Sequence, residues 1–290
     1  MFYIFLSICC SVAVSVLLKL AKRYQIDVYQ AITWNYSAAI ILTWLFFRPH
    51  FTDLQGAPIL TYVSLGILLP LLFIVIASSI TLTGIVRTDV AQRLSLFIPV
   101  LSSYVIFGEV LNGIKITGVS IGIIAMLCLI PWKQKRAVRR RSTNSWLYLV
   151  VIFIGMGVID VLLKQIAKFT SVPFTTSLFI VFTLAFLVAF IGLLYMVFAK
   201  KMRFSWPHIL IGWVLGAANF GNIVFNIKAH QALSDHPSTV FSMMDIGVIV
   251  AGSIVGLFIF REKLSRLNVG GIILAIVAIV IIYFPEIFNF

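Results

Sequence analysis

The sequence contains one phrase twice, as IFGEVLNGIKITG at Ile106–Gly118 and as IFREKLSRLNVGG at Ile259–Gly271. The two copies share residues at a constant offset of 153 positions, namely Ile106/Ile259, Phe107/Phe260, Glu109/Glu262, Leu111/Leu264 and Gly118/Gly271. Each copy places a glutamate directly after an apolar run. A repeat of this kind indicates that the chain of 290 residues is built from two related halves.

The composition indicates that the apolar runs belong in a lipid bilayer. Hydrophobic residues make up 61% of the chain, charged residues only 11%, and the mean hydropathy is +1.11. Soluble domains are about half apolar and roughly a quarter charged. The net charge of +13 comes from basic residues in short gaps between apolar runs, which favours membrane topology over nucleic-acid binding. The three cysteines lie inside apolar runs without metal-ligand spacing, so neither a disulfide, a metal site nor a cofactor is predicted.

Ten segments are apolar over the roughly 20 residues that a helix needs to cross a bilayer. They are 2–20, 28–47, 59–82, 88–107, 112–131, 146–167, 174–199, 207–229, 237–260 and 267–285. The first lacks a basic leader and a cleavage site of small residues, so we expect a membrane helix there rather than a signal peptide. The predicted fold class is therefore an all-α integral membrane protein with ten transmembrane helices.

The ends of two segments repeat as well. VLLKLAKRY at Val16–Tyr24 matches VLLKQIAKF at Val161–Phe169, at an offset of 145. Each half then holds five helices, and an odd number of crossings inverts the second half relative to the first. We predict inverted repeats at 1–132 and 146–290, joined by a basic linker at 133–145.

These features resemble the drug/metabolite transporter superfamily, EamA type. The resemblance is carried by LFIPVLSSYVIFGEVLNGIKITGVSIGIIA (Leu96–Ala125) and VIVAGSIVGLFIFREKLSRLNVGGIILAIVAIVII (Val248–Ile282), and it covers essentially the whole chain. Pro99, at a position where the family typically has proline, is matched by Gly252 in the second half, which departs from a symmetric pattern. The resemblance implies a multi-pass transporter of the bacterial inner membrane, and it does not identify the substrate.

Polar residues inside apolar segments are the candidates for binding a substrate or a coupling ion, because charge at membrane depth is expensive. Asp245 lies about nine residues into its segment, with no basic residue one turn away. It fits a salt bridge to another helix and a proton or cation site equally well. Asp89 and Arg93 are four residues apart, beside Gln92, and a paired Arg93 keeps donors for an anionic group such as a carboxylate. The offset of 153 aligns Gln92 with Asp245.

Two further polar patterns lie on predicted helices. A stripe in the segment 207–229 consists of Asn219, Asn222 and Asn226. Such a stripe either binds neighbouring helices together or lines a cavity. Asp160 and Lys164 are four residues apart, which predicts an ion pair within one helix.

Glu109 and Glu262 are predicted to be structural, with a proton site as the alternative. Each precedes a short turn into the next helix, where a carboxylate accepts from free backbone N–H groups and faces the positive end of the helix dipole. Gly118 and Gly271 follow in those helices and favour close packing or a hinge. Three GxxxG pairs support close helix contacts: Gly118/Gly122, Gly212/Gly216 and Gly252/Gly256.

No P-loop, HExxH motif, Rossmann fingerprint or other catalytic constellation occurs in the sequence, so we do not expect an enzyme. We expect a secondary transporter, in the export direction, of a small polar or amphipathic metabolite such as an amino acid. Its partners are then the small-molecule substrate, the lipid bilayer and a proton or other coupling ion, without nucleic acid. The first alternative is drug or cation efflux, which the carboxylate of Asp245 would suit. The second alternative is a different class of protein, either a membrane-embedded enzyme or a lipid scramblase.

Basic residues are unevenly distributed between the two sets of loops. The gaps after the first, third, fifth, seventh and ninth segments hold most of the 22 Lys and Arg residues, including KQKRAVRRR at Lys133–Arg141. The opposite side holds only Arg48, Lys115, Lys164, Lys168 and Lys228. The positive-inside rule therefore puts the KQKRAVRRR loop in the cytoplasm and both termini outside. The family resemblance instead implies cytoplasmic termini.

A reporter fused after Phe290 decides between these orientations. On the charge distribution we expect alkaline phosphatase activity from this fusion, because phosphatase matures only outside the cytoplasm. The same reporter fused after Lys135 should be inactive and serves as the matched control. A fluorescent protein that matures at Phe290 in the cytoplasm would contradict the charge-based orientation.

Overall fold

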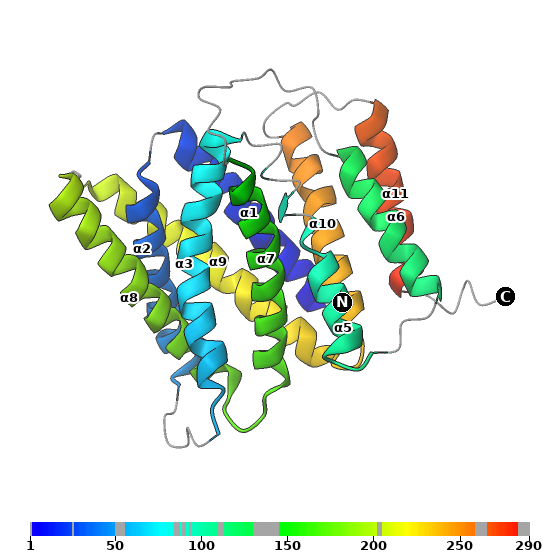
Figure 1. Cartoon of the computed structure of the whole chain (residues 1–290), viewed down its shortest axis with the longest axis horizontal. Helices are drawn as coiled ribbons and strands as arrows, with labels where there is room; N and C mark the ends of the chain where they lie inside the picture. The colour runs from blue at the N-terminus through cyan, green and yellow to red at the C-terminus, as the bar shows by residue number, and fades with distance from the viewer. Residues whose placement is uncertain are drawn as a thin grey trace.

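The computed structural model describes residues 2–24, 26–49, 56–83, 88, 91–92, 94–109, 113–129, 145–201, 205–258 and 266–283. Within these ranges the regular structure is helical, without any strand. The helices, in chain order (Figure 1), are α1 (Phe2–Arg23), α2 (Val28–Phe47), α3 (Ile59–Leu82), α5 (Phe97–Val105), α6 (Gly113–Leu129), α7 (Ser145–Lys168), α8 (Phe174–Lys200), α9 (Trp206–Ala232), α10 (Pro237–Phe258) and α11 (Arg266–Tyr283). The all-α fold class is confirmed for the described residues.

Five helices, α3, α7, α8, α9 and α10, are long and apolar enough to cross a membrane, judged by length and composition. Shorter apolar stretches occupy Phe2–Leu18, Gly113–Cys128 and Val269–Ile282. The helices are thus compatible with a multi-pass membrane protein, and the count of ten crossings stays a prediction. The predicted linker at 133–145 lies outside the described residues except for Ser145, at which α7 begins.

Large apolar side chains cover much of the outside of the bundle. Leu60 of α3 is 81% exposed, Phe198 of α8 is 79% exposed and Trp206 of α9 is 75% exposed. Soluble monomers rarely expose large contiguous apolar patches, because water penalises them. A lipid environment removes that penalty, in agreement with the high mean hydropathy.

Local signals in the sequence set the ends of the helices. α2 spans the predicted range because the Asp27 side chain accepts from the Gln30 backbone N–H at 3.0 Å and caps the first turn. The helix stops at Arg48, whose φ of 43° is left-handed and whose N–H donates to the Trp44 carbonyl oxygen. α3 likewise covers the predicted segment 59–82.

The segment predicted as one helix at 88–107 is interrupted among the residues that the structure describes. Residues 88, 91–92 and 94 are helical, a turn follows at Ser95 and Leu96, and α5 then spans 9 residues. Pro99 lies in the first turn of α5, where a missing backbone N–H does no harm because the first N–H groups of a helix have no partner within it. The proline therefore marks the start of a helical piece rather than its middle.

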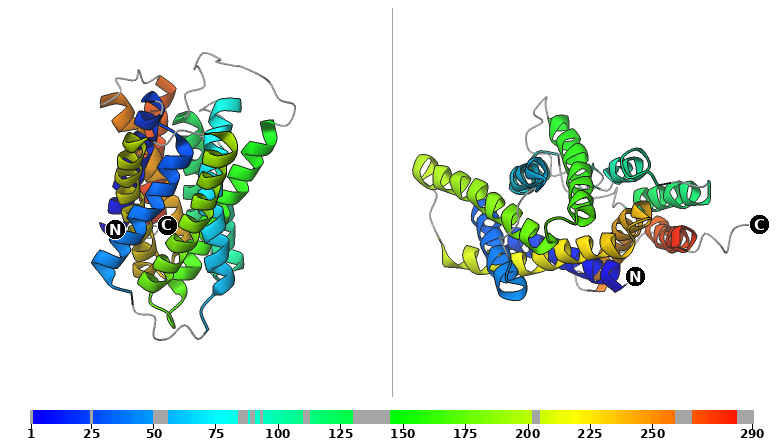
Figure 2. Two further views of the ribbon diagram at one scale, coloured as in Figure 1. Left: turned by 90° about the vertical axis from the view of Figure 1, so that its left-hand side faces the viewer. Right: turned by 90° about the horizontal axis from the view of Figure 1, so that it is seen from below.

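Two apolar cores hold the bundle together, and each mixes helices from both halves of the chain. The first core joins α2, α3, α7, α8 and α9 and includes Tyr36 and Phe182, both 0% exposed. The second core joins α1, α6, α10 and α11 and includes Met126 and Ile246. Seen from below in Figure 2, α8 lies at one end of the bundle and α6 and α11 lie side by side at the other. The halves are therefore interlocked rather than separate globular units.

Glycines mark the places where helices approach most closely. A Cβ at Gly216 of α9 would meet the Asn35 carbonyl oxygen and the Ala38 side chain of α2, so these two backbones are in contact. Gly212, one turn earlier, meets α2 in the same way. A Cβ at Gly252 would enter open space. The GxxxG pair on α9 thus serves helix packing, whereas Gly252 makes no such contact.

The substitution Gly216→Ala should lower the melting temperature of the protein. The new methyl group would meet the Asn35 carbonyl oxygen, and overpacking of this kind destabilises by about 1–3 kcal/mol. Gly252→Ala is the matched control, since the methyl group has room and alanine favours a helix by roughly 0.5–1 kcal/mol over glycine. Thermal denaturation in detergent measures both variants, and equal melting temperatures would contradict the contact assigned to Gly216.

Candidate functional site

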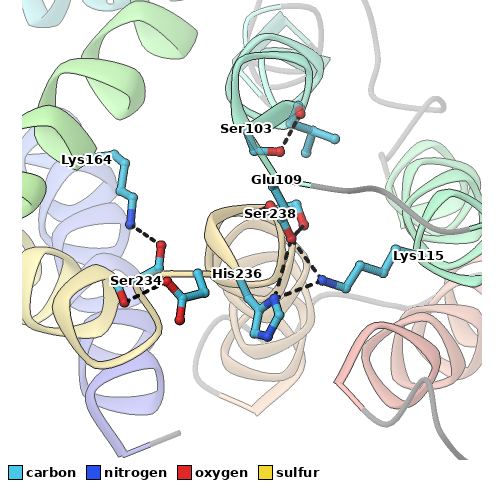
Figure 3. A network of polar contacts seen from close by, with 9 residues as sticks. Ser103, Glu109, Lys115, Lys164, Ser234, His236 and Ser238 are labelled. Atoms are coloured by element: carbon cyan, nitrogen blue, oxygen red, sulfur yellow. Dashed lines mark hydrogen bonds and ion pairs between the residues drawn. The ribbon is translucent and has the colours of Figure 1, made fainter. Parts of the chain in front are cut away.

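A network of polar contacts surrounds the turn at 233–236 between α9 and α10 (Figure 3). Glu109 and Lys115 hold the start of α10, and Lys164 of α7 holds the end of α9. We call these three side chains the clamp. Their residues are only 6%, 7% and 2% exposed, respectively. In Figure 3, Lys164 and Lys115 approach the turn from opposite sides.

The Glu109 carboxylate caps the N-terminus of α10. Its Oε2 accepts from the Ser238 backbone N–H at 2.8 Å, and its Oε1 accepts from the Ser238 hydroxyl at 2.6 Å. Ser238 is in the first turn of α10, where backbone N–H groups have no partner inside the helix. The carboxylate satisfies one of these groups and faces the positive end of the helix dipole.

The segment after α5 directs this carboxylate toward α10. Gly108 has a φ of 71°, a left-handed conformation that glycine adopts without steric cost. The Glu109 N–H then donates to the Ser103 carbonyl oxygen of α5 at 2.9 Å. The second copy of the phrase has Arg261 in place of this glycine, and Glu262 lies outside the described residues.

Lys115 of α6 supplies the opposite charge. Its Nζ donates to Glu109 Oε1 at 2.8 Å and lies 3.2 Å from His236 Nδ1. A buried carboxylate without a cationic partner is strongly destabilising, and a hydrogen-bonded lysine offsets that penalty. His236 is exposed, so the pair lies just beneath the surface of the turn.

The sequence predicted that Glu109 would support the helix directly after it. The carboxylate instead binds α10, at a separation of 129 residues, while the following helix contributes Lys115. The reason is that α10 packs on both α5 and α6 and so brings its own free N–H groups to the carboxylate. The cap is therefore a contact between the two halves of the chain.

Lys164 completes the clamp at the other side of the turn. Its Nζ donates to the carbonyl oxygens of His230 at 3.3 Å and Ser234 at 3.1 Å. Positive charge is favourable here because the C-terminal end of a helix carries the negative end of its dipole. The ion pair that was predicted between Lys164 and Asp160 is not formed among the described residues. The ammonium group of Lys164 instead donates its hydrogen bonds to these two carbonyl oxygens.

Two aspartates lie deeper in the bundle than the clamp. Asp245 is about two turns into α10, and Asp160 is one turn before Lys164 on α7. Both side chains are half-buried. The sequence singled out Asp245 but treated Asp160 as half of a local pair. The structure adds Asp160 to the candidate site.

The predicted asparagine stripe of α9 contacts two other helices. The Ser7 hydroxyl of α1 donates to Asn222 Oδ1 at 2.8 Å, and Asn226 Nδ2 donates to Met244 Sδ of α10 at 3.4 Å. Asn219 is buried, and its Nδ2 has no hydrogen-bond partner within the described ranges. The stripe therefore joins α9 to α1 and α10, as interhelical contacts do.

The remaining predicted site residues are only partly described. Gln92 is half-buried, and its backbone carbonyl oxygen accepts from the Ser95 hydroxyl at 2.5 Å. Asp89 and Arg93 lie outside the described residues, so the anion site assigned to Arg93 stays a prediction. Of the predicted hinge glycines, Gly118 packs against Ile282 of α11. Gly271 is buried in α11.

The sequence reasoning missed Lys115, Lys164 and Asp160 as members of one region. A usable signal was present, because each lies within an apolar segment, where a charged group needs a partner or a cavity. The partners themselves come from distant parts of the chain. Spacing along a single helix therefore could not identify them.

The groups gathered here suit recognition by charge and hydrogen bonds. They are carboxylates on α7 and α10, amides on α9 and a hydroxyl on α1. Within the part of the chain that the structure describes, no three His, Cys, Asp or Glu side chains are grouped so as to hold a metal ion.

Comparison with known proteins gives a relative and a fold. No protein-family model matches the chain. An uncharacterized protein of Haemophilus influenzae (strain ATCC 51907 / DSM 11121 / KW20 / Rd) is 41% identical over 291 residues, which cover 97% of each chain. A solved crystal structure matches with a TM-score of 0.71 at 15% identity, over 97% of this chain and 94% of that one. At this identity the crystal structure shows that the fold is shared and nothing more.

Removing the capping carboxylate by Glu109→Ala should destabilise the protein by about 3–5 kcal/mol, because Lys115 would stay buried without its partner. Asp235→Asn is the matched control, since this carboxylate is exposed and accepts from the neighbouring Ser234 hydroxyl at 3.3 Å. Thermal denaturation compares the variants, and Glu109→Ala combined with Lys115→Met should recover part of the loss. A melting temperature of Glu109→Ala equal to that of the control would contradict the clamp.

Proposed function

We propose that this chain, which belongs to the same family as the Haemophilus influenzae protein, is a secondary transporter with ten membrane-spanning helices. Two inverted five-helix repeats, 1–132 and 146–290, surround one substrate site in the bacterial inner membrane. The protein is of the drug/metabolite transporter type, EamA-like. It moves a small polar or amphipathic metabolite, such as an amino acid, by alternating access.

The observation that carries the proposal is a pairing of helix contacts between the halves. The sequence offsets match α1, α2 and α3 with α7, α8 and α9, and α5 and α6 with α10 and α11. When each helix is replaced by its counterpart in the other half, every contact should turn into a second contact that also exists. The α2–α9 contact turns into α8–α3, the α1–α9 contact into α7–α3, and the α1–α10 contact into α7–α5. All six of these helix pairs are in contact. The pairs α2–α8, α5–α10 and α6–α11 correspond to themselves and also occur. Two repeats related by a two-fold axis would produce this pattern.

The exceptions to the pairing are also informative. The α7–α9, α10–α11 and α6–α10 contacts occur, whereas the corresponding α1–α3, α5–α6 and α5–α11 contacts are weak or lacking among the described residues. In the opposite direction, α2–α3 contacts occur while the corresponding α8–α9 contacts are weak or lacking there. Alternating access exchanges the contacts of two equivalent halves. Unequal contacts are therefore expected of a transporter that is closed on one side. The clamp lies at the ends of α7 and α9.

The polar residues of α7, α9 and α10 support a substrate site. Asp160, Asn222 and Asp245 are half-buried on helices that are otherwise apolar. Polar groups at bilayer depth are expensive and normally face a cavity or a partner. Binding of a polar metabolite gives such groups a function.

Efflux of organic cations is the second candidate function. It is favoured by two half-buried acidic side chains on otherwise apolar helices, Asp160 of α7 and Asp245 of α10, because a carboxylate suits a positively charged compound. The two candidates share the fold and the transport cycle. They differ in the charge of the molecule that is moved.

A metabolite screen followed by a flux assay tests the proposal. A true ligand should raise the melting temperature of the purified protein, by the equivalent of about 2.7 kcal/mol at a hundredfold excess over Kd. Each stabilising compound is then supplied in labelled form to proteoliposomes, with protein-free liposomes as the control. We expect uptake that Asp245→Asn abolishes without loss of folding. Lipid scrambling without movement of any stabilising compound would contradict the proposal.

A further inference from the structure

We propose that the outer strip of α9 between α1 and α2 binds a phospholipid with an anionic head group, and that Lys228 holds its phosphate. The inference does not depend on the transport function and requires only that the helices lie in a bilayer. Three features support it: the surroundings of the Lys228 ammonium group, the helices that flank it, and the apolar strip of α9 that leads to it.

Lys228 is a half-buried lysine of α9 whose ammonium group lies near two aromatic rings. Its Nζ is 5.6 Å from the ring centroid of Tyr3 in α1 and 5.9 Å from that of Phe47 in α2. An aromatic ring attracts a cation electrostatically but carries no net charge to neutralise it. Lys228 makes no hydrogen bond or ion pair within the described ranges. Its positive charge and its three N–H donors are therefore available to a ligand.

Lys115 and Lys164, by contrast, use their ammonium groups inside the chain. Lys115 donates to Glu109, and Lys164 donates to carbonyl oxygens at the end of α9. A lysine near a helix end often extends its ammonium group to the bilayer surface without a specific partner. Lys228 differs from this behaviour, because rings from two other helices lie beside its ammonium group and fix its position.

The two flanking helices leave a strip of α9 uncovered. α1 and α2 both pack on α9, whereas contacts between α1 and α2 are weak or lacking among the described residues. Leu210 of α9 is 62% exposed and Val214 is 55% exposed. Ala217 is also exposed, and Gly221 is half-exposed. These four residues form an apolar strip that lipid can contact.

The apolar strip and Lys228 lie on the same face of α9. Lys228 follows Gly221, Ala217 and Val214 by 7, 11 and 14 positions, and these spacings return to one face in a helix of 3.6 residues per turn. One leaflet contributes about 15 Å of the hydrocarbon core, and about ten helical residues rise by the same distance. An acyl chain that starts from a head group at Lys228 therefore covers Gly221 and ends near Ala217.

Aromatic and basic side chains mark this end of the strip as the place of a head group. Phe2 is 69% exposed, with its ring centroid 6.0 Å from that of Tyr3, and Phe46 beside Phe47 is 66% exposed. Arg48 follows directly, is exposed, and adds a second positive charge at the end of α2. Aromatic residues collect at membrane interfaces, and basic pockets between helices bind anionic head groups. The charges here favour a negative phospholipid over a zwitterionic one.

Native mass spectrometry of the purified full-length protein tests the site with dioleoyl phosphatidylglycerol and dioleoyl phosphatidylcholine. The acyl chains are identical, so a difference in Kd reports the head group. We expect phosphatidylglycerol to bind the wild type more tightly. Lys228→Met should weaken its binding about fivefold, as expected for the loss of one lysine near an anionic lipid. Lys228→Arg should retain the affinity, because the positive charge stays.

Lys168→Met is the matched control. It removes the same charge from an exposed lysine of α7, whose Nζ lies 5.9 Å from the Phe107 ring centroid. This variant should bind phosphatidylglycerol like the wild type. Equal losses in Lys168→Met and Lys228→Met would show general attraction between charges and overturn the site, as would an unchanged Kd in Lys228→Met.

Two measurements on the wild type keep the inference testable if Lys228→Met does not fold. Equal Kd values for the two lipids would overturn it. Glycerol 3-phosphate carries the phosphate charge without acyl chains, and we expect that it does not displace phosphatidylglycerol at equal concentration. Displacement would show a site for soluble phosphate esters and contradict a lipid site. None of these measurements involves flux, so the lipid site and the transport function stand or fall separately.

Discussion

The ends of α9 and α10 meet at one turn, and the second half of the bundle depends on how their backbone groups are satisfied. A helix leaves its last carbonyl oxygens and its first N–H groups without partners. Here the adjoining residues His230 and Ser238 are each only 1% exposed, so water has little access to hydrogen-bond their backbone groups. Lys164 supplies the donor for one end and Glu109 supplies the acceptor for the other. Both charges also match the local sign of the helix dipoles.

This arrangement ties the position of the candidate site to the clamp. α7 carries both Lys164 and Asp160, and α10 carries both Asp245 and the N-terminus that Glu109 caps. Helices transmit displacements as nearly rigid elements. A movement that releases the turn therefore shifts both carboxylates together. The connection is physical because the same two helices hold both sets of residues.

Hydropathy alone located the described helices well, because a segment that must avoid water has one dominant requirement. α2 and α3 begin and end where they were predicted. The prediction of one unbroken helix at 88–107 was wrong, since the hydropathy of this segment hides the turn at Ser95 and Leu96 that precedes Pro99. The interlocking of the two cores could not be predicted either, because it depends on which helices pack together.

The site residues were harder to predict for a related reason. The repeated phrase identified Glu109 as important, but its partner Ser238 lies on a helix of the other half. Asp160 and Lys164 have the spacing of a local ion pair, and that pattern concealed the longer-range partners of Lys164. Spacing describes neighbours on one helix. The partners of buried charges are set by tertiary packing.

Lys115 and Lys164 are committed to the ends of helices and not to the aspartate that lies one turn from Lys164. Lys115 is held by a carboxylate that has already accepted two hydrogen bonds from Ser238, and Lys164 is held by carbonyl oxygens that no water replaces easily. Moving either lysine to Asp160 would expose a helix end or leave Glu109 unpaired, and both changes are costly in a buried place. Both lysines are therefore fixed at the turn between α9 and α10, where they stabilise the fold.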